Sequence, residues 1–166
     1  MVAVVMCVLF PSFAQAEQIM EQSAVRLNDD IVLYTVTFDF GFLNADVWMP
    51  VGAVRNSTMI GKPPVLGYSF YNESKEAVEE GNSYSVVLSD APLIDGAYFI
   101  PERTRATFTL LTLLQLPRGN DMAEQDISLQ VTSLPHIIKR ASEDDTFIRQ
   151  LSKVDLEAYH TETVSF

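Results

Sequence analysis

Hydrophobic and polar residues alternate along most of the chain, which is typical of strands with one buried face. The clearest case is residues 31–42, where every second position from residue 32 onward is apolar. Four large aromatic side chains on this side are predicted to form the central wall of the core: Tyr34, Phe38, Phe40 and Phe42. The opposite side carries Thr35, Thr37 and Asp39, and contact with anything outside the domain is expected there.

Shorter alternating runs follow at residues 47–51, 66–70, 84–88, 98–100, 104–114 and 126–134, with Pro, Gly and Asn between them. In the two longest runs the apolar side is formed by Ala106, Phe108, Leu110 and Leu114, and by Ile127, Leu129 and Val131. Six or seven short strands at this spacing predict an all-β fold of two packed antiparallel sheets. We therefore interpret residues 31–135 as a β-sandwich domain and residues 17–30 as an N-terminal lead-in.

The pattern changes in residues 136–166. Ser142 is followed by Glu143, Asp144 and Asp145, which is typical of a helix start with acidic residues in its first turn. Apolar residues then recur at spacings of three and four: Phe147, Ile148, Leu151, Val154 and Ala158. This spacing predicts a short C-terminal helical segment. The tail "YHTETVSF" alternates again and could add a last short strand.

In strand count and spacing, residues 25–135 resemble an immunoglobulin-like sandwich. The paired cysteines of antibody domains are absent, and Trp48 is the candidate for a core tryptophan. The stretches "VVLSDAPLIDGAYFIP" and "RATFTLLTLL" also resemble those of small, uncharacterised exported bacterial proteins. A likeness of architecture alone implies no activity.

The N-terminus predicts export. Residues 1–16, "MVAVVMCVLFPSFAQA", are apolar and end in Ala14-Gln15-Ala16, the small-x-small pattern of a signal-peptidase site. About ten apolar residues before Pro11 are too few to span a bilayer, which takes about 20. No Lys or Arg precedes the apolar run, which departs from the usual signal-peptide pattern. We expect cleavage near Ala16 and a secreted, periplasmic or cell-surface protein.

Composition narrows the range of partners. The 166 residues carry 22 acidic and 11 basic side chains, a net charge of -11 that would repel a nucleic-acid backbone. The single cysteine, Cys7, lies within the predicted leader, so the mature chain can form no disulfide and its core must hold it together. We expect a protein or surface partner, no nucleic acid and no membrane span in the mature chain. The pattern is compatible with homo-oligomerisation through a sheet edge but does not require it.

Catalytic motifs are missing, so no catalytic or cofactor-binding residue is assigned. The two histidines, His136 and His160, have no zinc-ligand spacing and are expected to be structural. Ser69 lacks the second glycine of a nucleophile elbow and is expected to face solvent. Asn56 and Asn72 begin tripeptides with the form of glycosylation acceptors, and both lie in predicted loops.

Carboxylates supply the abundant polar chemistry. One cluster, at Asn28, Asp29 and Asp30, precedes the first long strand, and another contains Asp144 and Asp145. Calcium prefers several oxygen ligands, so these four aspartates are the candidate metal ligands. A turn and a helix start explain the same residues without a metal.

Two function hypotheses follow. The first is an exported, non-catalytic structural or protein-interaction module of the cell envelope, because no nucleophile, metal or cofactor constellation is visible. The alternative is a β-sandwich that binds a small ligand, a carbohydrate or calcium through aromatic and carboxylate groups. A closed core favours the first, and exposed rings beside convergent carboxylates favour the second.

Overall fold

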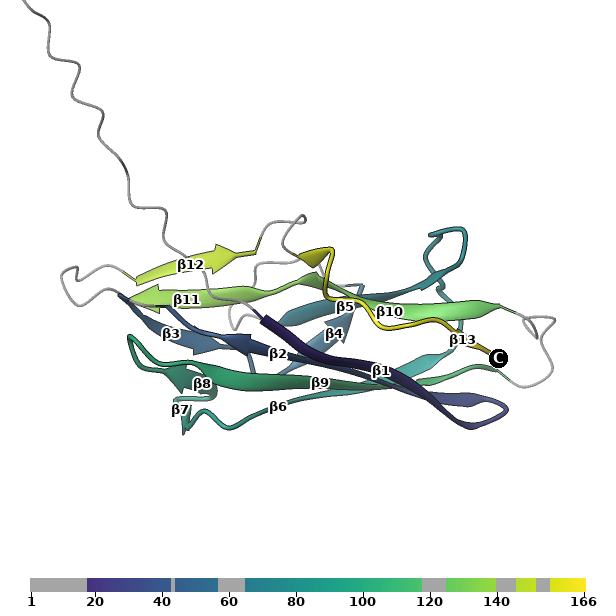
Figure 1. Ribbon diagram of the computed structural model, residues 1–166, viewed down its shortest axis with the longest axis horizontal. Coiled ribbons are helices and arrows are strands. Elements are labelled where there is room, and N and C mark those ends of the chain that lie inside the picture. The colour runs from purple at the N-terminus through teal and green to yellow at the C-terminus, as the bar shows by residue number, and fades with distance from the viewer. Residues whose placement is uncertain (1–17, 43, 57–64, 118–124, 140–145, 152–155) are drawn as a thin grey trace, which may run out of the picture.

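The computed structural model describes residues 18–42, 44–56, 65–117, 125–139, 146–151 and 156–166. These residues form an all-β fold of three sheets with almost no helix (Figure 1). All strand pairs are antiparallel except one. The predicted all-β fold with antiparallel sheets is therefore confirmed.

The first sheet has the order β1-β2-β9-β6. Its strands are β1 (Gln18–Asn28), β2 (Ile31–Phe40), β9 (Ala106–Gln115) and β6 (Asn82–Ser89). β2 and β9 pair without interruption over ten residues each, which makes them the centre of this layer. β1 covers most of the segment predicted as a lead-in, and pairs with β2 through two register shifts.

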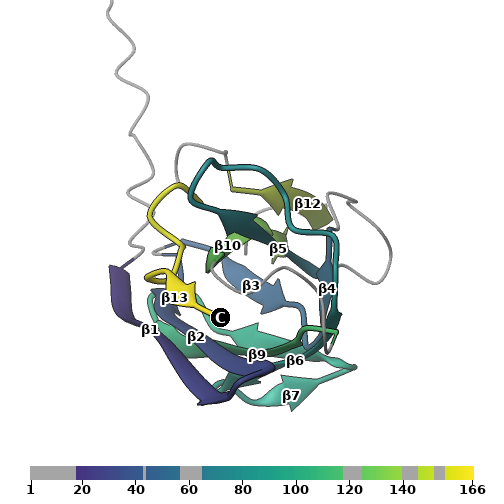
Figure 2. The ribbon, with the colours of Figure 1, turned by 90° about the vertical axis from the view of Figure 1, so that its right-hand side faces the viewer.

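The second sheet lies across the core from the first and shares one run of chain with the third (Figures 1 and 2). The second sheet has the order β13-β10-β5-β4, with β13 (Val164–Ser165), β10 (Asp126–Ser133), β5 (Leu66–Asn72) and β4 (Ala53–Arg55). The third has the order β12-β11-β3-β8-β7, with β12 (Thr146–Gln150), β11 (Pro135–Lys139), β3 (Asp46–Met49), β8 (Ala97–Ile100) and β7 (Leu93–Ile94). It runs from the layer of the second sheet, at β12 and β11, round to β8 and β7 beside the first sheet.

β10 leads directly into β11, but their partners differ, so the layer is two sheets where the sequence predicted one. β5 pairs with β10 as far as Ser133, and β3 pairs with β11 from Ile137. No described strand pairs with both β10 and β11.

The predicted aromatic wall lies in the core. Tyr34, Phe38 and Phe40 have no exposed surface, while Phe42 is partly buried against them. The Tyr34 ring lies 5.3 Å from that of Phe70, and its hydroxyl donates to the carbonyl of Ile127 at 3.1 Å. This contact joins the first sheet to the second. The apolar sides predicted for residues 104–114 and 126–134 are buried as well.

Gly41 falls on the polar side of the alternation, yet it is buried, because the chain passes very close to it. A Cβ atom at this position would overlap the carbonyl oxygen of Thr104. The alternation of residues 31–42 thus includes one position where only glycine fits.

The predicted C-terminal helix is wrong over residues 146–150, which form β12 and pair with β11 in register from Pro135 to Lys139. The spacing of apolar residues also fits a strand followed by a turn, and β11 offers an edge whose backbone groups need partners. The Ser142 helix start and Val154 lie outside the described residues. The predicted last strand is confirmed as β13, which pairs with β10.

Trp48 is not a core tryptophan. It is half-buried on the side of β3 opposite Val47 and Met49, which are both buried, and its ring lies 5.0 Å from that of Phe99. The alternation of β3 assigns only one side to the core, and the smaller residues occupy it. The immunoglobulin-like resemblance therefore receives no support from this residue.

Candidate interaction surface on the first sheet

The polar side of β2, where the sequence predicted external contact, is half-buried. The Thr37 hydroxyl lies 3.1 Å from that of Thr109, and the Thr107 hydroxyl donates to Asp39 Oδ1 at 2.8 Å. These hydrogen bonds tie β2 to β9 across the outer face of the sheet. These hydroxyl and carboxylate groups thus hydrogen-bond mainly to each other. The side chains available to a partner lie in the neighbouring rows.

Apolar side chains continue this outer face in a row that crosses all four strands. Register places Val25 opposite Leu33, Leu33 opposite Leu113, and Leu113 opposite Tyr84. The two ends of the row are exposed, Val25 at 52% and Tyr84 at 64%. Cross-strand neighbours of this kind lie about 5 Å apart, so the row is continuous.

The next rows add apolar residues on the β6 side. Val86 lies opposite Leu111, and Leu88 follows on the same face, opposite Thr109. Val86 and Leu88 are 45% and 47% exposed. We define the outer patch as the apolar residues of these rows: Val25, Leu33, Tyr84, Val86, Leu88, Leu111 and Leu113.

The outer patch lies on the least charged part of the sheet. No residue of β6 or β9 carries a charge, although 20% of the whole chain is charged. Glu21 and Asp39 lie on the same outer face in the rows away from Leu33. A partner on the outer patch would therefore meet apolar and hydroxyl groups over β6 and β9.

Sequence reasoning identified β2, β6 and β9, but it assigned β1 to a lead-in and missed the surface. The alternation at Tyr84, Val86 and Leu88 predicts a strand with one apolar side, and hydrophobicity alone would direct that side inward. In the structure Val87 is buried and the other three face out. A signal was available in "TLLTLL", where Leu110–Leu111 and Leu113–Leu114 make both sides of β9 apolar.

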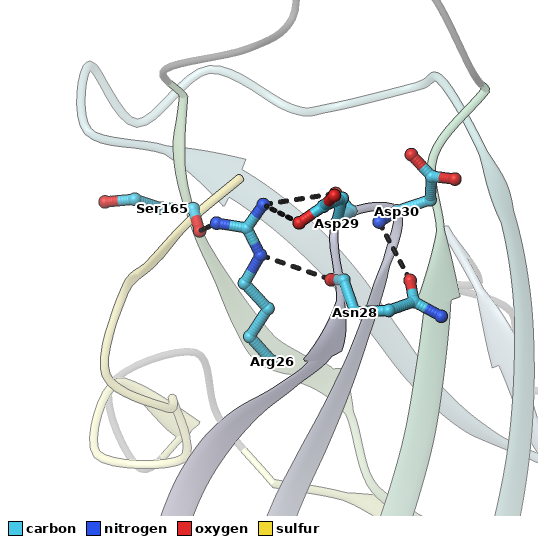
Figure 3. Close-up of polar contacts among 5 residues, drawn as sticks. All are labelled: Arg26, Asn28, Asp29, Asp30 and Ser165. Atoms are coloured by element: carbon cyan, nitrogen blue, oxygen red, sulfur yellow. Dashed lines mark hydrogen bonds and ion pairs between the residues drawn. The ribbon is translucent and has the colours of Figure 1, made fainter.

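The predicted metal candidates Asp29 and Asp30 form the turn between β1 and β2 (Figure 3). Asp29 forms an ion pair with Arg26 at 3.3 Å, and its side chain is 99% exposed. Asn28 Oδ1 accepts the backbone N–H of Asp30 at 2.9 Å, which closes the turn. Arg26 also donates to three carbonyls, those of Asn28, Asp29 and Ser165, so this cluster joins the hairpin to the C-terminal strand.

The other metal candidates, Asp144 and Asp145, lie outside the described residues. Within the described ranges, no group of three or more His, Cys, Asp or Glu side chains is placed to hold a metal ion. The metal prediction stays untested.

His136 is buried between two aromatic rings. Its ring centroid lies 4.9 Å from that of Phe40 and 5.6 Å from that of Phe42, and Nδ1 lies 3.3 Å from the carbonyl oxygen of Leu134. Nε2 has no hydrogen-bond partner. Burial lowers the pKa of His136 to about 4, so the ring is neutral at pH 7. His160 is exposed in the tail, with Nδ1 2.9 Å from the carbonyl of Glu157.

Ser69 was expected to face solvent and is buried instead. Its hydroxyl donates to Asn56 Oδ1 at 3.0 Å, and Asn56 Nδ2 donates to Glu79 at 2.9 Å. Asn56 has a positive φ of 57°, and its side chain links β5 to the loop that precedes β6. The amide of this glycosylation tripeptide is thus already hydrogen-bonded within the chain.

No family model matches the chain, and no curated protein matches it in sequence. Among the described residues, no helix has both the length and the hydropathy needed to cross a membrane.

Proposed function

We propose that the protein is an exported, non-catalytic interaction module of the cell envelope that binds a protein partner through the outer patch. The observation that carries the proposal is the exposed apolar row from Val25 to Tyr84 and its extension along β6. Complete burial of an exposed apolar side chain contributes about 1.5–3 kcal/mol, and these side chains, about half exposed, retain roughly half of that for a complex, so a cluster of them is a source of binding energy. Contiguous apolar surface of this kind marks interaction sites in soluble proteins.

The sequence supports the cellular setting of this proposal. The apolar residues 1–16 and the Ala14-Gln15-Ala16 pattern indicate a cleaved leader, and cleavage there removes the single cysteine. Glu17 would then be the mature N-terminus, one residue before β1 begins. The antiparallel all-β layers are compatible with a β-sandwich, and we propose the immunoglobulin-like type, which the spacing of strands in the sequence resembles, as the architecture that displays the patch.

Site-specific photocrosslinking in the source cell tests the proposal. A photoreactive amino acid replaces Val86 in the outer patch or, as a matched control, Val54 on β4. The two valines are 45% and 47% exposed, and both lie on edge strands. We expect a discrete crosslinked protein product from position 86 and none from position 54, with the linked peptides identified by mass spectrometry. Equal labelling from both positions, or none from position 86, would contradict the proposal.

A further inference from the structure

We infer that the occupant of the outer patch is a second copy of this chain, packed face to face across a two-fold axis. This inference rests on the proposed function and commits it to one partner. A two-fold interface uses the same surface on both subunits, so that surface must be complementary to itself. Apolar and hydroxyl side chains meet this requirement, since either kind can pack against its own copy.

Charge favours a second copy over a basic partner. A chain with a net charge of -11 repels its copy over most of its surface. β6 and β9 are uncharged, so close approach there brings no carboxylate against another. A basic partner would instead find no carboxylate on these two strands with which to pair. The outer patch thus suits an acidic copy better than a lysine-rich or arginine-rich surface.

The size of the face is sufficient for a dimer. Four strands of 8 to 11 residues, at about 3.3 Å per residue and about 4.8 Å apart, cover roughly 600 Å² in projection. Protruding side chains raise the accessible area above this value. A standard interface buries about 800 Å² per partner, so an interface centred on β6 and β9 would extend over β2 and β1, with Glu21 and Asp39 in the rows away from its centre.

The free edge of β6 is a less suitable contact than its face, because neighbouring strands already use groups along it. The Tyr98 hydroxyl donates to the carbonyl of Val87 at 3.0 Å, and the Ser85 hydroxyl donates to that of Ala53 at 2.9 Å. Strand addition at β6 would have to displace these contacts. Packing of face on face leaves them intact, as in stacked sheets about 10 Å apart.

Sedimentation velocity of the full chain tests the inference with three proteins: wild type, Val86→Glu and Val54→Glu. We expect a concentration-dependent dimer for wild type and for Val54→Glu. In Val86→Glu two added carboxylates are buried in each dimer, so the dissociation constant should rise at least about tenfold. Circular dichroism melting checks that both variants fold. Wild-type dimerisation should also tighten as NaCl rises, because salt screens the repulsion between acidic copies.

Several outcomes would overturn the inference. One is a wild-type chain that stays monomeric at high micromolar concentration and at every salt concentration. Another is association that Val86→Glu and wild type share equally, which would place the contact elsewhere, residues 1–16 included. If position 86 crosslinks in cells to a different protein, the second copy is excluded while the proposed interaction surface stands. If position 86 crosslinks to nothing, both fail.

Discussion

At the scale of single residues, His136 makes the stability of the fold sensitive to acid. Its pKa is lowered to about 4 by burial, against about 6.5 for an accessible histidine. The unfolded chain therefore takes up a proton before the native chain does. The free energy of unfolding should fall as pH decreases through 6.5 towards 4, and His136 alone should account for about 3 kcal/mol of the loss.

Urea unfolding at pH 7 and pH 4.5 measures this effect. In His136→Phe an uncharged ring lies against Phe40 and Phe42, so we expect its stability to fall less than that of wild type, by about 2 to 3 kcal/mol. His160→Gln serves as the control, since His160 is exposed, and it should keep the wild-type dependence. All three proteins carry the same carboxylates, so the comparison isolates the contribution of the histidine. If the free energy of unfolding fell equally for wild type and His136→Phe between the two pH values, protonation of His136 would not destabilise the native state.

At the scale of elements, Arg55 fixes the loop between β5 and β6 to the end of β4. Its guanidinium donates to the carbonyls of Gly81 at 2.8 Å and Glu80 at 3.1 Å, and to that of Val78. It also lies 5.1 Å from the centre of the Phe70 ring. One planar cation with several donors holds three carbonyls, an arrangement that a lysine ammonium does not reproduce.

Arg55→Lys should therefore loosen this loop. The amide of Val78, which donates to Phe70 at 2.9 Å, should exchange with deuterium faster by roughly tenfold, and the loss of global stability should be about 1–3 kcal/mol. Arg105→Lys, at an exposed position, is the control and should leave exchange at Val78 unchanged. Unchanged exchange in Arg55→Lys would mean that the loop is held by its other contacts.

At the same scale, some elements could not be predicted from the local pattern of hydrophobic residues. The two central strands of the first sheet, β2 and β9, were predictable, because ten-residue alternation has few other interpretations, whereas the sequence predicted β1 only as a lead-in. β12 was not predictable, since its apolar spacing fits a helix as well as a strand, and pairing with β11 decides between them. The outer patch was predictable only in part. The sequence "TLLTLL" has apolar residues on both sides of β9, but the local sequence of β6 does not indicate which of its sides packs against the core.

At the scale of the whole molecule, the C-terminal tail closes the core between the first and second sheets (Figure 2). Tyr159 is buried, with its ring 5.2 Å from that of Phe38, and its carbonyl accepts the backbone N–H of Val131 at 2.9 Å. Thr161 donates its backbone N–H to Leu129 at 2.8 Å. Gln22 of β1 donates to the carbonyl of Ala158, so the tail also contacts the edge of the first sheet.

Tyr159→Ala should thus lower the free energy of unfolding by about 3–5 kcal/mol, because it opens a cavity beside Phe38. Chemical denaturation followed by the near-ultraviolet signal of the aromatic core measures the loss. His160→Ala changes the exposed neighbour in the same tail and should stay within about 0.5 kcal/mol of wild type. A loss below about 1 kcal/mol for Tyr159→Ala would mean that the tail is not part of the cooperative core.

The sequence by itself determined the fold class, the inward side of β2, β9 and β10, and the acidic, disulfide-free character of the chain after residue 16. These properties follow from local periodicity and composition, which every segment carries with it. Only the tertiary structure decided that β12 is a strand, that Trp48 stays out of the core, and that Tyr84, Val86 and Leu88 face outward. The physical reason is that a side chain is buried or exposed by what packs against it, and those neighbours come from strands distant in sequence.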